Sequence, residues 1–279
     1  MAGTASWHLP YGAGRQAVVP LGQGRVLVAG GMLAGDASTS QVVRVDLRQG
    51  QVTPMPPLAV PVHDTAGGLV GSDPVVVGGG NATEQDVVQE LRGGAWHVVG
   101  HLPTTRSDLS VVPTSRGPWV VGGYDGTGTP KTILGLGQQA SVRPVGRLAV
   151  GVRYAATAVL GHTAYALGGE VLGRELEVVQ AVDLRTGRTR VVARLPVPVG
   201  HAMAAVEGDR ILLMGGRVTP DRQTADMWWF DPASGQFRHA GRLPRALSDA
   251  AVATDRHRVW LLGGEDPGVT DGVVVVDVR

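Results

Sequence analysis

Short apolar segments that end in a pair of glycines recur along the whole chain. The segments at 25–29, 75–77, 211–214 and 259–262 are rich in aliphatic side chains. They are too short for helices and are typical of strands buried on both faces. The glycine pairs are spaced 44 to 48 residues apart, at Gly30-Gly31, Gly78-Gly79, Gly122-Gly123, Gly168-Gly169, Gly215-Gly216 and Gly263-Gly264. This period predicts a repeat protein with several strands in each unit.

Each repeat continues after its glycines with a polar loop and two further strands. Third strands are predicted at 41–47, 181–184, 227–231 and 273–278, several of them ending in Asp and a turn. A fourth, outer strand then leads into Leu-Pro, where proline is tolerated because an edge strand needs no ladder donor there. Six such units predict an all-β fold, a six-bladed β-propeller of four-stranded blades that takes residues 1–279 as one domain.

The two ends of the chain predict how the ring closes. The last repeat stops at 273–279 with only three of its four strands accounted for. Residues 4–10, with Trp7 before Leu9-Pro10, have the pattern of the missing outer strand. We therefore expect the N-terminal strand to complete the last blade, which removes an exposed sheet edge.

The repeat resembles that of the kelch family over essentially the whole chain. The fifth repeat, 211–244, is the most similar, with Gly-Gly, an aromatic third strand, an Asp turn and Leu-Pro. The third repeat has a Gly-rich segment at 133–137 in place of the aromatic strand, and the fourth lacks an aromatic residue in its outer strand. We therefore expect eroded outer strands in these two blades.

Composition excludes several classes of function. The chain has 25 Lys and Arg against 24 Asp and Glu, so its net charge of +1 does not attract nucleic acid or an anionic membrane. Without cysteine it has no disulfide, thiolate metal site or Cys nucleophile. The Cys-Tyr crosslink of the copper radical oxidases among kelch proteins is likewise impossible. No zinc, nucleophile-elbow or phosphate-loop motif is present, so we expect no metal and no cofactor.

Other features bear on the setting of the protein. Lys131 is the only lysine, and this preference for arginine is typical of a GC-rich, bacterial genome. Residues 1–14 lack the pattern of a signal peptide, and no apolar stretch reaches about 18 residues. We expect a soluble protein, probably a monomer, that is secreted if a further segment precedes it naturally and cytoplasmic otherwise.

Basic residues recur where each innermost strand begins. Aligned on the glycine pairs, this position holds Arg15, His63, Arg106, Arg153, His201 and Ser248. In a propeller these residues should converge around the axial opening, where arginine can hold an anion bidentately. The kelch resemblance also implies contacts to an acidic peptide from this position. The alternative is that these residues only pair with the nearby Asp64, Asp108 and Asp249.

Residues that follow the glycine pairs should face the same rim. They are Met32, Asn81, Tyr124, Glu170, Arg217 and Glu265, of which Asn81, Tyr124 and Arg217 are further candidate ligand contacts. Glu170 or Glu265 beside a basic residue is a candidate general acid or base. The resemblance to kelch-type sialic acid mutarotases implies such a role on an anionic sugar.

Two functions follow from these residues. The first is a binding propeller that recognises a small anion or an acidic peptide at the Arg/His rim. The second is a metal-independent enzyme, an isomerase, mutarotase or lyase, that uses a rim carboxylate. A closed, ligand-sized pocket would favour the enzyme, and a broad funnel would favour a peptide ligand.

Overall fold

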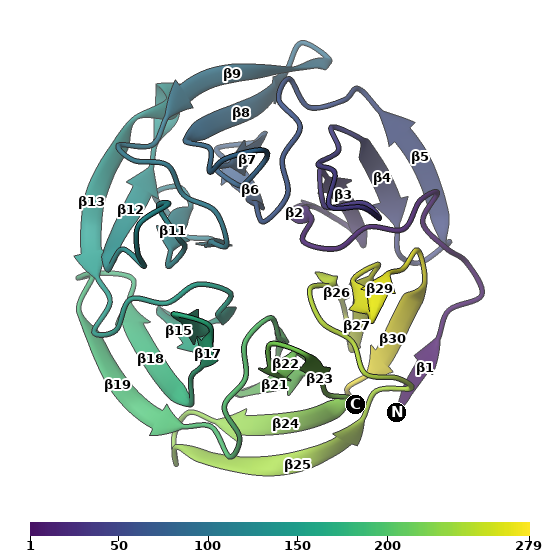
Figure 1. Cartoon of the computed structure of the whole chain (residues 1–279), viewed down its shortest axis with the longest axis vertical. Helices are drawn as coiled ribbons and strands as arrows, with labels where there is room; N and C mark the ends of the chain where they lie inside the picture. Colours follow the sequence, from purple (N-terminus) through teal and green to yellow (C-terminus); the bar gives the residue numbers. More distant parts are fainter.

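Six four-stranded antiparallel sheets form a closed ring around a central axis (Figure 1). The structure is a computed structural model and describes residues 1–279. The outermost strands lie at the perimeter, and the N- and C-termini lie next to one another beside β1 and β30 (Figure 1). The sequence-based prediction of a six-bladed propeller is confirmed.

The first three blades follow one another along the chain. Blade 1 consists of β2 (Ala17–Gly22), β3 (Arg25–Ala29), β4 (Val42–Asp46) and β5 (Gln51–Met55). Blade 2 consists of β6 (Ala66–Val70), β7 (Asp73–Val77), β8 (Val87–Arg92) and β9 (Ala95–His101). Blade 3 consists of β10 (Ser110–Val112), β11 (Trp119–Val121), β12 (Thr132–Leu136) and β13 (Val142–Arg147).

The other three blades each carry an additional short hairpin between the second and third strand. Blade 4 consists of β14 (Ala156–Leu160), β15 (Thr163–Leu167), β18 (Val178–Asp183) and β19 (Thr189–Arg194), with hairpin β16 (Glu170–Val171) and β17 (Arg174–Glu175). Blade 5 consists of β20 (Met203–Glu207), β21 (Arg210–Met214), β24 (Asp226–Asp231) and β25 (Gln236–Arg242), with hairpin β22 (Arg217–Thr219) and β23 (Arg222–Gln223). Blade 6 consists of β26 (Ala251–Asp255), β27 (Arg258–Leu262), β30 (Val273–Asp277) and β1 (Ala2–Thr4), with hairpin β28 (Glu265–Asp266) and β29 (Gly268–Val269).

The hydrophobic core consists of layers between neighbouring blades. The layer between blades 5 and 6, for example, contains Leu212 and Met214 from one blade and Val259 and Leu261 from the other. The second strand of a blade is buried on both faces, so β21 and β27 are apolar at every position after their initial Arg. The outer strand β25 is largely half-buried or exposed, which explains its polar residues.

The ring closes through the N-terminal strand, as the sequence predicts, but with different bounds. Strand β1 pairs with β30, with Ala2 opposite Val276. The strand ends at Thr4, and the following segment keeps only separate hydrogen bonds to blade 6. Trp7 therefore lies outside the strand, where its indole covers the turn at Gly50.

The outer strands of blades 3 and 4 are complete, contrary to the erosion expected from their sequences. Strands β13 and β19 each have six residues and pair along their length with β12 and β18. A register shift in each pairing accommodates the irregular sequence. Aromatic residues are thus not required there, since aliphatic side chains provide the packing.

The glycine pairs allow neighbouring blades to approach closely. Gly30 has a φ of +66°, and a Cβ atom there would lie 2.4 Å from the carbonyl oxygen of Val62. The amide of Gly31 donates a hydrogen bond of 2.8 Å to the same carbonyl. Equivalent bonds to the next blade are Gly79 to Arg106, Gly123 to Val152, Gly169 to Val199, Gly216 to Leu247 and Gly264 to Ala13.

The only helical element is the short 3-10 turn η1 (Gln138–Ala140). No helix in the structure has the length and apolar character needed to cross a membrane.

Candidate functional site

One residue from each blade contributes to a ring of backbone hydrogen bonds around the axis. Each donates its amide hydrogen to the carbonyl of the equivalent residue in the preceding blade, at 2.9 to 3.1 Å. The six residues, which we call the axial ring, are Arg15, Asp64, Asp108, Tyr154, His201 and Asp249. All six have a left-handed backbone with φ between 51° and 60°. This conformation is uncommon for residues other than glycine, and it carries each side chain to the start of an innermost strand.

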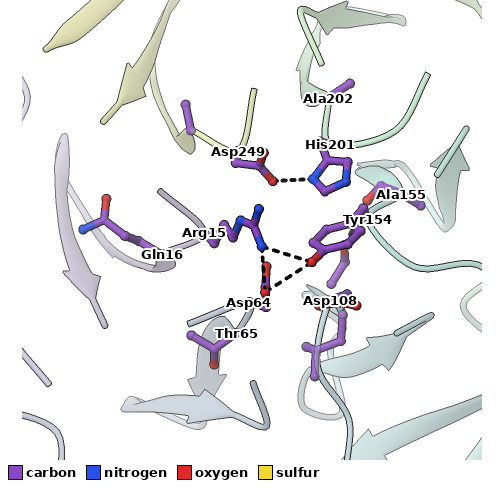
Figure 2. Close-up of a pocket in the computed structure, with 13 residues that line it drawn as sticks. Arg15, Gln16, Asp64, Thr65, Asp108, Tyr154, Ala155, His201, Ala202 and Asp249 are labelled. Atoms are coloured by element: carbon purple, nitrogen blue, oxygen red, sulfur yellow. Dashed lines mark hydrogen bonds and ion pairs between the residues drawn. The ribbon is translucent and has the colours of Figure 1, made fainter. Parts of the chain in front are cut away.

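A small cavity of about 120 Å³ lies among these side chains. Its lining consists of the axial ring and residues that follow it in the chain (Figure 2). Arg15 and Tyr154 point toward one another across the axis, and the Arg15 Nη1 lies 3.3 Å from the Tyr154 hydroxyl (Figure 2). Both donate to Oδ2 of Asp64, each at 3.2 Å. The centre of the cavity is thus polar and its groups are held by one another.

A second tier of residues lies beside the axial ring. The residue before each ring member forms a β-bridge with the first or second residue beyond a glycine pair. These bridges are Gly14–Met32, His63–Gly80, Ser107–Tyr124, Arg153–Glu170, Gly200–Arg217 and Ser248–Glu265. The second tier therefore places charged side chains from blades 4, 5 and 6 next to the axial ring.

Arginines and carboxylates of the two tiers form a connected network. Glu265 accepts hydrogen bonds from the Arg15 Nε at 2.8 Å and the Arg217 Nη2 at 2.5 Å. The Arg217 Nη2 also donates to Asp249 at 3.2 Å, and Asp249 accepts a 2.7 Å bond from the Nδ1 of His201. The carboxylates are buried, with side chains that are 8% exposed for Glu265 and 4% for Asp249. Burial of this kind requires that the charges be compensated, as they are here.

The same network continues on the side of blades 3 and 4. Arg153 donates to Glu170 at 2.5 Å from Nη2 and to Asp108 at 3.4 Å from Nη1. The Nε2 of His201 lies 3.5 Å from Glu170, so His201 is placed between two carboxylates. The hydrogen bond from His201, together with Arg153, lowers the pKa of Glu170 to about 2. Glu170 is thus ionised throughout the neutral range.

The histidine carries a charge at neutral pH. Burial by itself would lower the pKa of His201, but the charge and hydrogen bond of Asp249 and the contact to Glu170 raise it to about 9. In turn, burial of Asp249 is outweighed by His201 and the two neighbouring arginines, which bring the pKa of that carboxyl to about 2. His201 and Asp249 therefore form an ion pair near neutrality.

Asp108 behaves differently from the other carboxyl groups. Burial raises its pKa to about 7, and the charge of the neighbouring ring residue Asp64 acts in the same direction. Arg153 offsets these effects only in part, since its guanidinium lies closer to Glu170. Asp108 is therefore a carboxyl group that can gain and lose a proton near pH 7.

The structure brings most of the predicted site residues together. Arg15 and His201 belong to the axial ring. His63, Arg153 and Ser248 immediately precede ring members, and Tyr124, Glu170, Arg217 and Glu265 complete the second tier. The Tyr124 ring lies 5.2 Å from the guanidinium carbon of Arg153.

Arg106 and Asn81 lie away from the cavity, which corrects the alignment at these two positions. Arg106 precedes the ring residue Asp108 by two positions and is 2% exposed between blades 2 and 3. Its Nη1 donates to the carbonyl of Thr132 at 2.9 Å, and its Nε has no partner. Asn81 is exposed and donates to the carbonyl of Pro61 at 3.0 Å, while Gly80 occupies the second tier.

Four ring residues were not proposed as ligand contacts from the sequence, namely Asp64, Asp108, Tyr154 and Asp249. A signal for them exists, because each of these and His201 stands 14 residues before the first glycine of its pair. The sequence analysis followed the recurrence of basic side chains and accepted spacings that differed by a residue. In the structure, a constant spacing identifies the ring.

No group of three or more His, Asp or Glu side chains is placed to hold a metal ion.

The comparisons with known proteins extend the description of the fold. No protein-family model matches the sequence, and no curated protein matches it. The solved structure of YjhT is similar with a TM-score of 0.84, at 14% sequence identity, over 96% of this chain and 99% of YjhT. This similarity shows the six-bladed propeller, and at such low identity it does not extend to function.

Proposed function

We propose that the axial cavity binds a small molecule with an anionic group and that Asp108 exchanges a proton with it in a metal-independent isomerisation. The observation that supports this most is the position of Asp108 and Asp64, neighbours in the axial ring, on the same small cavity. One of the two carboxyl groups has a pKa of about 7. Carboxyl pairs with different proton affinities commonly supply acid and base to one reaction.

The environments of the two carboxyl groups assign their roles. Asp64 accepts hydrogen bonds from Arg15 and Tyr154, which favour its ionised form. Asp108 holds a proton over much of the neutral range because it is buried beside that charge. At pH 7 the cavity therefore offers a carboxylate as general base and a protonated carboxyl as general acid.

Mutarotation of a sugar acid is a reaction that such a pair can catalyse. The acid donates a proton to the ring oxygen while the base removes the proton of the anomeric hydroxyl. The bond between the anomeric carbon and the ring oxygen breaks, and its electrons are retained by that oxygen as the carbonyl forms. Closure on the other face of the carbonyl reverses both proton transfers and restores the two aspartates.

The arginines supply the contact to the anionic group. Each of Arg15, Arg153 and Arg217 has a carboxylate partner, so the rim is charge-balanced. The Nη2 of Arg15 and the Nη1 of Arg217 nevertheless make no hydrogen bond within the protein. These two donors are the ones we expect to contact a ligand carboxylate.

In this proposal Glu170 and Glu265 hold the arginines in position, and Asp108 has the proton-transfer role considered for them in the sequence analysis. The low pKa of Glu170 supports this division, since a carboxyl with a pKa of about 2 rarely carries a proton at neutral pH.

A second candidate is a binding protein that uses the same arginines without turnover. The unused donors of Arg15 and Arg217 support it equally. A long acidic peptide is a less suitable ligand, because the cavity of about 120 Å³ accommodates only a small group.

Anomer exchange measured by NMR separates these functions. Sialic acid and a panel of other sugar acids are titrated into the parent protein and into Asp108→Asn, with Asp209→Asn as a control on an exposed turn of blade 5. We expect the parent and the control to accelerate exchange, and Asp108→Asn to bind the same ligand with a rate at least 100-fold lower. Binding without acceleration would support the binding protein, and failure of every sugar acid to bind would overturn both functions for this ligand class.

A further inference from the structure

A second cavity lies at the opposite end of the propeller from the axial ring. It has a volume of about 410 Å³ and is lined by residues of blades 1 and 6. The axial ring lies where the innermost strands begin, whereas this cavity borders the turn at the end of innermost strand β26. Arg48 contributes from the turn after β4, and Arg256 and Arg258 contribute from the turn between β26 and β27. The site is thus separate from the proposed functional site.

Two of its arginines are held in place by carboxylates. Arg48 donates to Asp255 at 2.7 Å from Nε and at 2.8 Å from Nη2, and this bond joins blade 1 to blade 6. Arg279 donates in the same way to Asp277, at 3.0 and 2.6 Å. Because each pair uses Nε and Nη2, the Nη1 group of each arginine remains available to a ligand.

The other two arginines have no carboxylate partner. Neither Arg256 nor Arg258 forms a salt bridge, and both are exposed. His257, between them, is paired with Glu207 at 2.6 Å. The four guanidinium groups of the cavity are therefore opposed only by the carboxylates of Asp255 and Asp277, which leaves two positive charges uncompensated.

We propose that this cavity binds a phosphate-bearing small molecule. Two uncompensated positive charges match a dianion, and guanidinium groups from several directions match the oxygens of a phosphate group. The volume lies within the range of small-molecule sites and exceeds that of the axial cavity. Scattered surface arginines would lack both the concave shape and the two guanidinium groups that are already oriented.

The ligand would bridge the two blades at which the ring closes. Arg48 belongs to blade 1, and the remaining arginines belong to blade 6, which the N-terminal strand completes. A ligand that contacts both blades binds only the closed ring, so it must stabilise the folded protein.

Titration calorimetry with inorganic pyrophosphate, phosphate and sulfate tests the proposal. The variant is Arg256→Ala with Arg258→Ala, and the control is Arg185→Ala with Arg188→Ala, which removes two exposed arginines from a turn of blade 4. We expect pyrophosphate to bind the parent and the control, to bind the variant at least tenfold more weakly, and to raise the parent's melting temperature by about 3 °C near saturation.

Three outcomes would overturn the proposal: no binding to the parent, equal losses in variant and control, or sulfate binding as tightly as phosphate and pyrophosphate. The test is independent of the axial site. Pyrophosphate should bind Asp108→Asn as it binds the parent, whatever that variant does to sugar acids.

Discussion

The phenol ring of Tyr154 stacks on the imidazole of His201, with ring centroids 3.7 Å apart and planes inclined by 24°. His201 is charged near neutrality because its pKa is about 9, so a cation lies against the face of an aromatic ring. Tyr154 also donates its hydroxyl hydrogen to Asp64. The stack therefore connects the ion pair of blades 5 and 6 with the carboxyl pair of blades 2 and 3.

The charge of His201 makes stability depend on pH. A histidine pKa raised on folding from 6.5 to about 9 adds stability that is complete below pH 6.5 and lost as the pH rises through 9. The difference in unfolding free energy between the parent and His201→Gln should therefore shrink by on the order of 2–3 kcal/mol between pH 6 and pH 9.5. Urea denaturation of both proteins at pH 6, 7.5 and 9.5 measures it. A constant difference would show that His201 is neutral in the folded protein.

Asp108 should contribute a pH dependence in a lower range. Its pKa is raised from 3.8 to about 7, so its contribution to stability is present below pH 3.8 and is lost as the pH rises through 7. Asp108→Asn has no such loss and should gain stability relative to the parent, by on the order of 2 kcal/mol, between pH 4 and pH 8. Thermal unfolding at the two pH values measures the change. A gain of the same size at both values would argue against a raised pKa.

Arg106 occupies a position that is apolar in every other blade. The equivalent residues, whose carbonyls accept from the neighbouring glycine pair, are Ala13, Val62, Val152, Val199 and Leu247. Burial lowers the pKa of Arg106, and its buried Nε has no hydrogen-bond partner. Arg106→Leu should therefore increase the free energy of unfolding by about 1 kcal/mol or more.

Denaturant midpoints of the parent and Arg106→Leu provide the measurement. The reverse change, Val152→Arg, is the matched control and should cost about 3 kcal/mol or more, since it places an unpaired charge in the same position of blade 4's neighbour. Destabilisation by Arg106→Leu would show that the hydrogen bond to Thr132 and the charge of Asp125 outweigh the cost of burial.

The close approach of blades can be tested at two glycines with similar backbones. Gly30 and Gly35 have φ of +66° and +79°, but a Cβ atom meets the carbonyl of Val62 at 2.4 Å in the first and nothing within 4 Å in the second. Gly35→Ala should cost about 1 kcal/mol through backbone strain alone. Gly30→Ala should cost about 2 kcal/mol more, as judged by urea denaturation. Equal costs would mean that the blades separate easily at this contact.

The fold was predictable because its signals are local and repeated. Each glycine pair marks a point where the backbone needs a positive φ and close approach, and the chain shows this six times at a nearly constant spacing. The completion of blade 6 by the N-terminal strand followed from counting strands. Its bounds did not, because Trp7 packs against the turn at Gly50 and not within a strand.

The site was predictable only in part. Arg15 and His201 were identified by their side-chain type, while the alignment by type took His63 for the ring residue Asp64 and Arg106 for Asp108. A shift of one residue moves a side chain from the ring to the second tier, and a shift of two moves it between blades. The pairing of the rim residues with nearby carboxylates, considered as an alternative, is what the structure contains. The pKa of Asp108 depends on burial and on Asp64 from another blade, which no local pattern encodes.

The circle of backbone hydrogen bonds in the axial ring has neither a first nor a last member. Every amide hydrogen in it is already taken by a neighbour, so the main chain at the axis has none to donate to a ligand. Recognition there falls to six side chains that can be exchanged while the scaffold beneath them keeps its bonds. The same framework can thus acquire a different specificity by substitution at the axis alone.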